Sequence, residues 1–300
     1  MLIDELYEMI REGDMPIFRI AVYEDGNLQE KQYLIANDCN NIYSVSKNFT
    51  ATAVGMLFDR GVISPDTKVR TLYEPQNKEL WKGIDERWHD ITVGQILTQV
   101  TGYKGMFLDM DCDNIFLYGT EDFLTKALTT PFVTNPGEKF AYSDANYYLL
   151  SRVVAAAAGE TLQSFAAREI FRPMEIQGWS WSTCPHGHAM GATRLFVKNM
   201  DLMKFGRLYL DKGEIYGRKL LSDDFVKTAT SSLVYKDEKT AYGYSFWKSN
   251  PKAEAFHCGG MYCQRIFVDP DRNLVVTWQA YDKEKKSNAI LSYLYKDTYK

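Results

Sequence analysis

Ser44 and Lys47 form a Ser-x-x-Lys tetrapeptide whose residue types could carry out nucleophilic catalysis. The tetrapeptide stands at the head of an apolar run from Asn48 to Arg60, and the Gly61 that follows is suited to ending a helix. Because residues three apart share one face of a helix, the lysine amine can reach back over the serine hydroxyl. A desolvated lysine can take the hydroxyl proton, and the helix N-terminus adds positive potential for an oxyanion. The spacing therefore predicts an activated serine.

Matches to Ser-x-x-Lys also arise by chance, so the tetrapeptide alone decides little. Two further matches, Ser245 to Lys248 and Ser249 to Lys252, are present in this chain. The first lies in a strand-like segment and the second contains a proline, so neither opens a helix. Without partners, Ser44 would be interpreted as a helix N-cap followed by a solvated lysine. The catalytic interpretation of Ser44 depends on residues further along the chain.

Two later segments supply such residues. Tyr142 and Asp144 are two apart in a loop that enters a helix, so both side chains can face Ser44. A tyrosine held beside a cation can move a proton between the serine and a leaving group. At the end of a predicted strand, alternation puts His257 and Gly259 on one face, and the glycine lets a substrate approach the backbone.

In this order, the three motifs resemble those of the penicillin-recognising serine hydrolases related to class C β-lactamases. That family includes D-amino-acid peptidases, family VIII-type esterases and 6-aminohexanoate-dimer hydrolases. Its motifs are Ser-x-x-Lys, Tyr-x-Asn, and Lys-Thr-Gly or His-x-Gly, and they match Ser44–Lys47, Tyr142–Asp144 and His257–Gly259. The stretches ITVGQILTQVTGY and YSDANYYLLSRVVAAAAGETL also resemble family segments. The resemblance extends from about Ile17 to the C-terminus.

The resemblance implies a role for each motif. Ser44 would attack a carbonyl and form an acyl-enzyme, with Lys47 and Tyr142 sharing the general-base and general-acid steps. Which of these two takes the first proton stays open. The backbone N–H groups of Ser44 and Gly260 would form the oxyanion hole. His257 would replace the lysine of the third motif, either polarising Tyr142 or meeting a substrate carboxylate.

Three departures from the family motifs bear on the substrate. Asp144 replaces the usual Asn and adds a negative charge that favours protonated Lys47. His257 in place of Lys, and Cys258 in place of Thr, remove groups that relatives use for a penicillin-type carboxylate. These departures favour an esterase or amidase over a dedicated β-lactamase. The residues predicted to contact the substrate are Gly259, Cys258, Tyr103 and Trp247.

Composition restricts the class of protein. Three hundred residues with 45% hydrophobic and 25% charged residues describe a globular chain, and a net charge of −4 gives no basic surface for nucleic acid. The sequence contains no apolar run of about 18 residues and no secretion signal at its start, so we expect a cytoplasmic protein. Its five cysteines are odd in number and widely spaced, which favours free thiols.

Two loops contain groups that could bind a metal. Cys184, His186 and His188 cluster in one loop, but a fourth ligand is not evident. The acidic segment from Asp109 to Asn114 opens like a calcium loop, yet its twelfth position is Thr120, so an acidic surface turn is expected there. The sequence therefore predicts no metal and no cofactor, and leaves the oligomeric state open.

Strand-like segments lie at both ends of the chain, with helical spacing between them. Residues 17–23 and 31–36 are predicted strands joined by a turn at 24–27, and four more strands are expected between 242 and 281. This pattern predicts an α+β fold: an antiparallel sheet flanked by terminal helices, with a mostly helical insertion. The family resemblance implies that this fold is of the β-lactamase/transpeptidase type. The expected domains are 1–62 with 190–300, and 63–189, with the active site in the cleft between them.

The sequence thus predicts a cofactor-free serine hydrolase that cleaves a small ester or amide, or a short peptide, through a Ser44 acyl-enzyme. A D-amino-acid peptidase or β-lactamase is the alternative within the same fold. A catalytically silent binding module is the alternative of another class. Hydrolysis and acyl transfer to another nucleophile are not distinguished by these residues.

Overall fold

The structure, a computed structural model, describes residues 1–112, 118–119 and 122–299 and divides the chain into two compact units. Unit 1 comprises residues 1–45, 172–180 and 195–300, and unit 2 comprises residues 46–171 and 181–194. The helix that follows Ser44 belongs to unit 2, because it packs along another helix of that unit. The expected domain of residues 1–62 with 190–300 instead grouped that helix with the sheet.

Unit 1 is built on an antiparallel sheet of eight strands in the order β2-β1-β13-β12-β11-β10-β9-β8. These strands are β1 (Ile17–Glu24), β2 (Asn27–Gln32), β8 (Val234–Asp237), β9 (Thr240–Tyr242), β10 (Trp247–Lys248), β11 (Phe256–Gly260), β12 (Gln264–Asp269) and β13 (Leu274–Ala280). Because β1 pairs with β13 along its length, segments from both ends of the chain form one sheet, as the sequence predicts.

The second strand of the β1–β2 hairpin begins earlier in the sequence than expected. Glu24 pairs with Asn27, which leaves Asp25 and Gly26 as a two-residue loop, and both have positive φ. Such a loop matches the twist of the flanking strands, so β2 starts directly after it and ends at Gln32. The predicted strand at 31–36 was therefore placed too late, whereas the turn was placed correctly.

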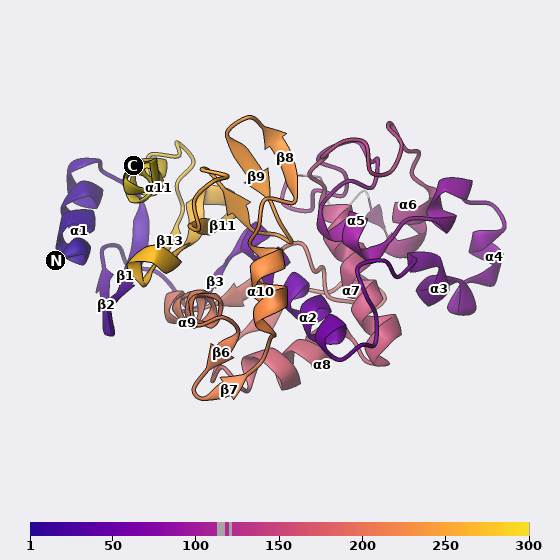
Figure 1. The fold of residues 1–300 in the computed structure, drawn as a ribbon, viewed down its shortest axis with the longest axis horizontal. Helices are drawn as coiled ribbons and strands as arrows, with labels where there is room; N and C mark the ends of the chain where they lie inside the picture. The colour runs from indigo at the N-terminus through magenta and orange to yellow at the C-terminus, as the bar shows by residue number, and fades with distance from the viewer. Residues whose placement is uncertain (113–117, 120–121, 300) are drawn as a thin grey trace. The chain divides into compact units, whose positions relative to one another are not determined.

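Helices cover both faces of the sheet. Residues of α1 (Leu2–Glu12) and α11 (Asn288–Tyr295) form one buried apolar cluster with the sheet residues Val276 and Trp278. Figure 1 shows both chain ends beside the β1–β13 part of the sheet. On the other face, α9 (Asn199–Leu210) comes so close that a Cβ on Gly206 would lie 2.5 Å from Val275.

The remaining elements of unit 1 are short. They are β3 (Asn40–Asn41), η1 (Tyr43–Val45), β5 (Leu195–Val197), β6 (Glu214–Ile215), β7 (Arg218–Lys219), α10 (Asp223–Ala229), η6 (Met261–Cys263), η7 (Pro270–Arg272) and η8 (Lys296–Tyr299). The two-residue strand β4 (Ser180–Trp181) lies where the chain passes from unit 1 to unit 2.

Unit 2 is helical. Its elements are α2 (Ser46–Asp59), α3 (Val69–Tyr73), η2 (Glu74–Gln76), α4 (Lys78–Trp81), η3 (Glu86–His89), α5 (Val93–Leu97), α6 (Phe123–Thr129), α7 (Asp144–Ala158), α8 (Leu162–Ala166) and a π-helical turn, η5 (Ala167–Phe171). α2 is buried on all sides from Ser46 to Leu57 and packs along α7. The chain leaves α2 through Gly61, whose φ of 66° agrees with the predicted helix end.

Among the described residues, none of the helices is long and apolar enough to span a membrane.

Candidate active site

Ser44 lies in unit 1, in the single turn η1 that leads directly into α2. The preceding residue, Tyr43, has a φ of 49°, a left-handed conformation that is strained for a residue with a side chain. Its amide donates to the Asn41 side-chain oxygen at 2.9 Å, and its ring packs against Tyr262 with 5.2 Å between centroids. These contacts hold a strained turn in which Ser44 stays partly exposed at the start of a buried helix.

The end of β11 lies against the segment that leads to Ser44. A Cβ on Gly260 would come within 2.4 Å of the Ile42 carbonyl oxygen, so only glycine fits there. β11 also packs on η1 within unit 1. The strand register puts His257 and Gly259 on one face of β11, as alternation predicts. The Gly260 N–H as an oxyanion donor stays a prediction.

His257 is held by the C-terminal helix of unit 1. Its Nδ1 lies 3.0 Å from the hydroxyl of Tyr295, and the ring is only 8% exposed. Burial lowers the pKa of His257 to about 3, and the nearby charge of Arg265 adds to this effect. The imidazole is therefore neutral at physiological pH and does not replace the fixed positive charge of a third-motif lysine. A hydrogen-bonding role for His257 stays a prediction.

Lys47 is almost completely buried in unit 2, with 1% of its surface exposed. Its ammonium donates to the Asp144 carboxylate at 2.6 Å and to the Ala192 carbonyl at 3.0 Å. It also lies 4.8 Å from the ring centre of Tyr142. Burial alone would lower the pKa of Lys47, but Asp144 and a hydrogen bond with Tyr142 outweigh it and raise the pKa above its usual value. Lys47 is thus an ammonium at neutral pH.

Two further carboxylates lie beside this ion pair. Oxygen atoms of Asp109, Asp111 and Asp144 all lie within 4.8 Å of one another. Thr193 donates a short hydrogen bond to Asp111. Burial raises the pKa of Asp144 to about 6; the attraction of Lys47 opposes this rise, and the other two carboxylates increase it. The prediction of an acidic surface turn is therefore wrong for Asp109 and Asp111, whereas Asp113 and Asn114 lie outside the described residues.

A backbone connection brings this acidic segment to Asp144. The Met106 amide donates to the Tyr142 carbonyl at 2.7 Å, and the Ser143 hydroxyl donates to the Phe107 carbonyl at 2.8 Å. Ser143 also caps α7, which starts at Asp144. The loop that carries Asp109 and Asp111 is thus fixed to the loop that carries Tyr142 and Asp144.

Three carboxylates this close could in principle hold a hard cation. Here the Lys47 ammonium sits directly on one of them and supplies positive charge to the cluster. The Arg194 guanidinium contributes at longer range, with its Nε 3.8 Å from Asp111. The local charge stays negative, because three carboxylates face two cations. That this site takes no metal stays a prediction.

Some of the residues predicted to contact the substrate are too buried for a ligand to reach. Tyr103 is completely buried; it donates its hydroxyl to the Ala127 carbonyl at 2.7 Å and stacks on Phe132, so it belongs to the core of unit 2. Cys258 is 1% exposed and faces the opposite side of β11 from His257, which leaves its thiol no contact with a ligand. Trp247 is partly exposed and pairs with His257, and its substrate role stays a prediction.

The Cys184–His188 loop is part of the packing of unit 2. The Cys184 thiol is 3% exposed and accepts a hydrogen bond from Tyr148 at 3.3 Å. The Cys184 amide also bonds to the His188 carbonyl at 2.8 Å. These contacts give the loop a structural role.

A family model described as Beta-lactamase matches residues 6–299. The chain belongs to the beta-lactamase family. This match confirms the family that the three motifs suggested.

Among curated proteins, unguisins hydrolase of Aspergillus violaceofuscus is 25% identical over 182 residues, which cover 57% of this chain and 32% of that protein. A protein named as penicillin-binding protein PbpX of Bacillus subtilis is 22% identical over 250 residues, covering 75% of this chain and 59% of that protein. The matched segments thus span about a third and three fifths of these relatives.

Solved structures confirm the β-lactamase/transpeptidase-like fold. A protein named as a 6-aminohexanoate-dimer hydrolase of Bacillus anthracis superposes with a TM-score of 0.80 at 18% identity, over 97% of this chain and 80% of that chain. A penicillin-binding protein of Bacillus halodurans gives 0.76 at 18% identity, over 96% and 99%. A class C β-lactamase of Rhodobacter sphaeroides gives 0.75 at 15% identity, over 96% of each chain.

Proposed function

We propose that this chain is a serine hydrolase that cleaves a small ester or amide through an acyl-enzyme on Ser44. The environment of Lys47 carries the proposal. Burying an ammonium between a carboxylate and a tyrosine costs desolvation free energy, and such perturbed charged groups are typical of active sites. Ser44 would attack the substrate carbonyl, and the N–H groups of Ser44 and Gly260 would stabilise the oxyanion. The alcohol or amine then leaves with a proton, and water releases the acid from Ser44.

In this proposal Tyr142 takes the first proton. Lys47 has no free electron pair while Asp144 keeps it protonated, so it cannot act as the base. A cation beside the phenol favours the phenolate, which makes Tyr142 a better proton acceptor. The protonated Tyr142 would then donate to the leaving group. Tyr142→Phe is therefore expected to reduce kcat by about 10³-fold with little change in KM, measured on an activated ester.

The charge around Lys47 favours a neutral substrate. Asp109, Asp111 and Asp144 outnumber the nearby cations, and His257 carries no charge at neutral pH. A penicillin-type carboxylate would gain little attraction here, whereas a neutral ester or amide would meet no repulsion. Two of the relatives are also named as hydrolases of other substrates, which supports an esterase or amidase over a β-lactamase.

Active-site labelling tests the proposal. We expect a fluorophosphonate probe to label the protein stoichiometrically on Ser44, and Ser44→Ala to abolish the label. The matched control is Ser249→Ala, since Ser249 heads another Ser-x-x-Lys and should not react. Labelling that survives in Ser44→Ala would refute the assignment.

The alternatives have distinct outcomes in the same assay. Rapid turnover of nitrocefin, lost in Ser44→Ala, would identify the β-lactamase alternative, and cleavage of D-amino-acid amides would identify the peptidase. A folded protein that no acylating reagent labels would be a catalytically silent module. A product ester in the presence of an added alcohol would indicate acyl transfer.

A further inference from the structure

A second buried lysine, Lys248, lies in unit 1 and has no role in the proposed reaction. It is the last residue of β10, pairs with Ala241 of β9, and is 6% exposed. Within the described residues its side chain makes neither a hydrogen bond nor an ion pair. Glu254 and Asp271 act on it only at longer range, and burial lowers its pKa. Lys248 is thus a buried amine without a partner, and its ammonium form is destabilised by the loss of hydration.

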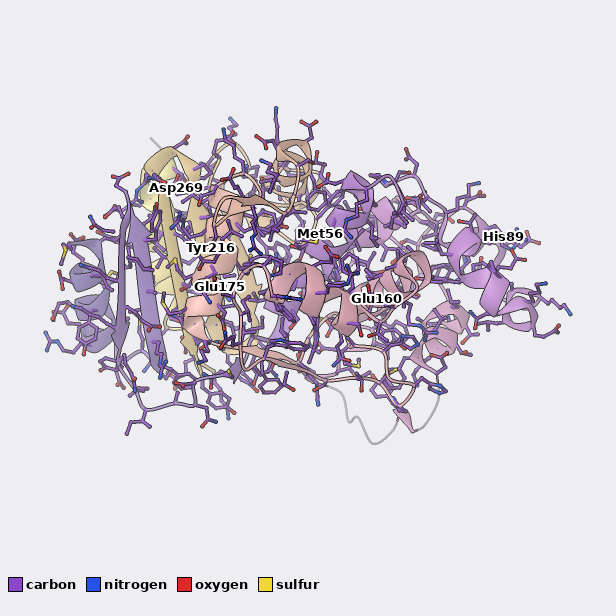
Figure 2. The ribbon with its side chains drawn as sticks, turned by 90° about the horizontal axis from the view of Figure 1, so that it is seen from below. Met56, His89, Glu160, Glu175, Tyr216 and Asp269 are labelled. Atoms are coloured by element: carbon purple, nitrogen blue, oxygen red, sulfur yellow. The ribbon has the colours of Figure 1, made fainter. Side chains whose placement is uncertain are left out.

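The Lys248 side chain lines a pocket of about 500 Å³ in unit 1. The amine nitrogen keeps some exposure to solvent, and Lys248 is one of the residues that line this pocket. Tyr209, Val226 and Phe256 contribute apolar surface, and Pro270 lies where the chain leaves β12. Asp269, the residue before this proline, is labelled in Figure 2. A volume of this size is enough for a small organic ligand.

Four lysines and three acidic residues line the pocket. Lys212, Lys227 and Lys252 line it along with Lys248, and none of the four takes part in an ion pair within the described chain. Of the three acidic lining residues, Asp223 is paired with Lys219 outside the pocket. The hydroxyls that follow α10 donate to backbone carbonyls, so their protons are already used. Asp224 and Glu254 form no ion pair with Lys248 within the described residues, so its ammonium lacks a direct anionic partner in this pocket.

We propose that this pocket binds a monocarboxylate with an apolar body, whose carboxylate pairs with the Lys248 ammonium. A lysine offers one compact charge, which suits a single carboxylate, whereas the lining contains no arginine for forked contacts to phosphate. The apolar side chains of Tyr209, Val226 and Phe256 would cover the rest of the ligand. The pocket includes Phe256 at the start of β11, so it lies about 13 Å along this strand from Gly260 and is distinct from the oxyanion position.

Calorimetric titration with acetate, octanoate and 4-phenylbutyrate tests the proposal, with inorganic phosphate as the anion that lacks an apolar body. We expect saturable binding at a single site for octanoate or 4-phenylbutyrate, and weaker binding for acetate and phosphate. Lys248→Met keeps the aliphatic stem and should weaken binding by about tenfold or more, whereas Lys248→Arg should retain part of it. The matched control, Lys252→Met, removes an exposed lining lysine and should bind as the unmodified protein does.

Two results would overturn the proposal. One is equal affinity in the unmodified protein and Lys248→Met; the other is the absence of saturable binding by all three carboxylates. Stronger binding of phosphate than of octanoate would assign the pocket to inorganic anions instead. Fluorophosphonate labelling of Ser44 serves as the folding control for each variant, and its failure in the unmodified protein would refute the proposed hydrolase without bearing on this pocket.

Discussion

Lys47 and Lys248 are two buried lysines in surroundings of opposite character. Lys47 lies in unit 2 with its ammonium 2.6 Å from a carboxylate and two more carboxylates close by. Lys248 lies in unit 1 at the edge of a pocket, without any ion pair in the described chain. Both are less than a tenth exposed, yet the pKa of Lys47 is raised and that of Lys248 is lowered.

The contrast shows that the partner, and not the depth of burial, decides the direction in which the pKa of a lysine shifts here. Burial disfavours the ammonium in both places, but at Lys47 the charge of Asp144 outweighs it. A lysine that is always charged cannot serve as a base, which is why the proposed base is Tyr142. A lysine without a partner is instead stabilised when an anion binds to it, which is why Lys248 is proposed as a ligand-binding group.

The largest expected effect is that of Lys47→Met. It removes the only cation in contact with Asp144 in the described structure, and should lower the free energy of unfolding by about 4 kcal/mol and ester hydrolysis by about 10³-fold. Urea unfolding and steady-state kinetics measure the two effects. Adding Asp144→Asn to this variant should restore part of the stability but not the activity. Unchanged stability of Lys47→Met would contradict the view that Lys47 compensates the carboxylates.

A second test uses the pH dependence of stability. The pKa of Asp144 is about 6 in the folded protein, above its ordinary value of 3.8, so between these values the folded state holds a proton that the unfolded chain has released. The contribution of Asp144 to stability is therefore present below pH 4 and is lost as the pH rises to about 6, by about 3 kcal/mol.

Comparing the protein with Asp144→Asn isolates this group, because other titrating residues affect both proteins alike. The difference between their unfolding free energies should change across this pH range and be flat above it. Since Asn is the usual family residue at this position, Asp144→Asn should keep ester hydrolysis within about tenfold of the original. A pH-independent difference would show that the folded and unfolded pKa values of Asp144 are equal.

Local patterns were enough to predict the motifs and most of the sheet, but not β8, one of its eight strands. Alternation and turn residues predict strands near both chain ends, and β1 pairs with β13 as that pattern requires. Three ordered motifs likewise predict the family. The approach of Asp109 and Asp111 to Lys47 has no local signal, because it depends on hydrogen bonds between residues 106–107 and 142–145. The sequence shows that this segment is rich in acidic residues, but it does not show that Asp109 and Asp111 lie beside the buried Lys47.

Residue type alone also could not separate core from binding surface. Tyr103 was predicted to contact substrate, yet aromatic residues fill cores as readily as they line clefts, and its hydroxyl found a backbone partner inside unit 2. Lys248 was set aside as a chance Ser-x-x-Lys match because it lies in a strand. Lys248 does lie in a strand, although residues 243–246 before it do not, and only the packing of β10 shows that this lysine is buried beside a pocket.

The smallest expected effect, opposite in sign to that of Lys47→Met, is that of Lys248→Met. Removing an unpaired buried charge while keeping its stem should raise the free energy of unfolding by about 1 kcal/mol, in the absence of added carboxylates. Urea unfolding measures this change, with Lys252→Met as the control that should stay within about 0.5 kcal/mol. Octanoate should also raise the free energy of unfolding of Lys248→Met by less than that of the unmodified protein, because a ligand stabilises only a protein that binds it. A loss of stability in Lys248→Met would mean that Lys248 already has a partner in solution, and the contrast with Lys47 would disappear.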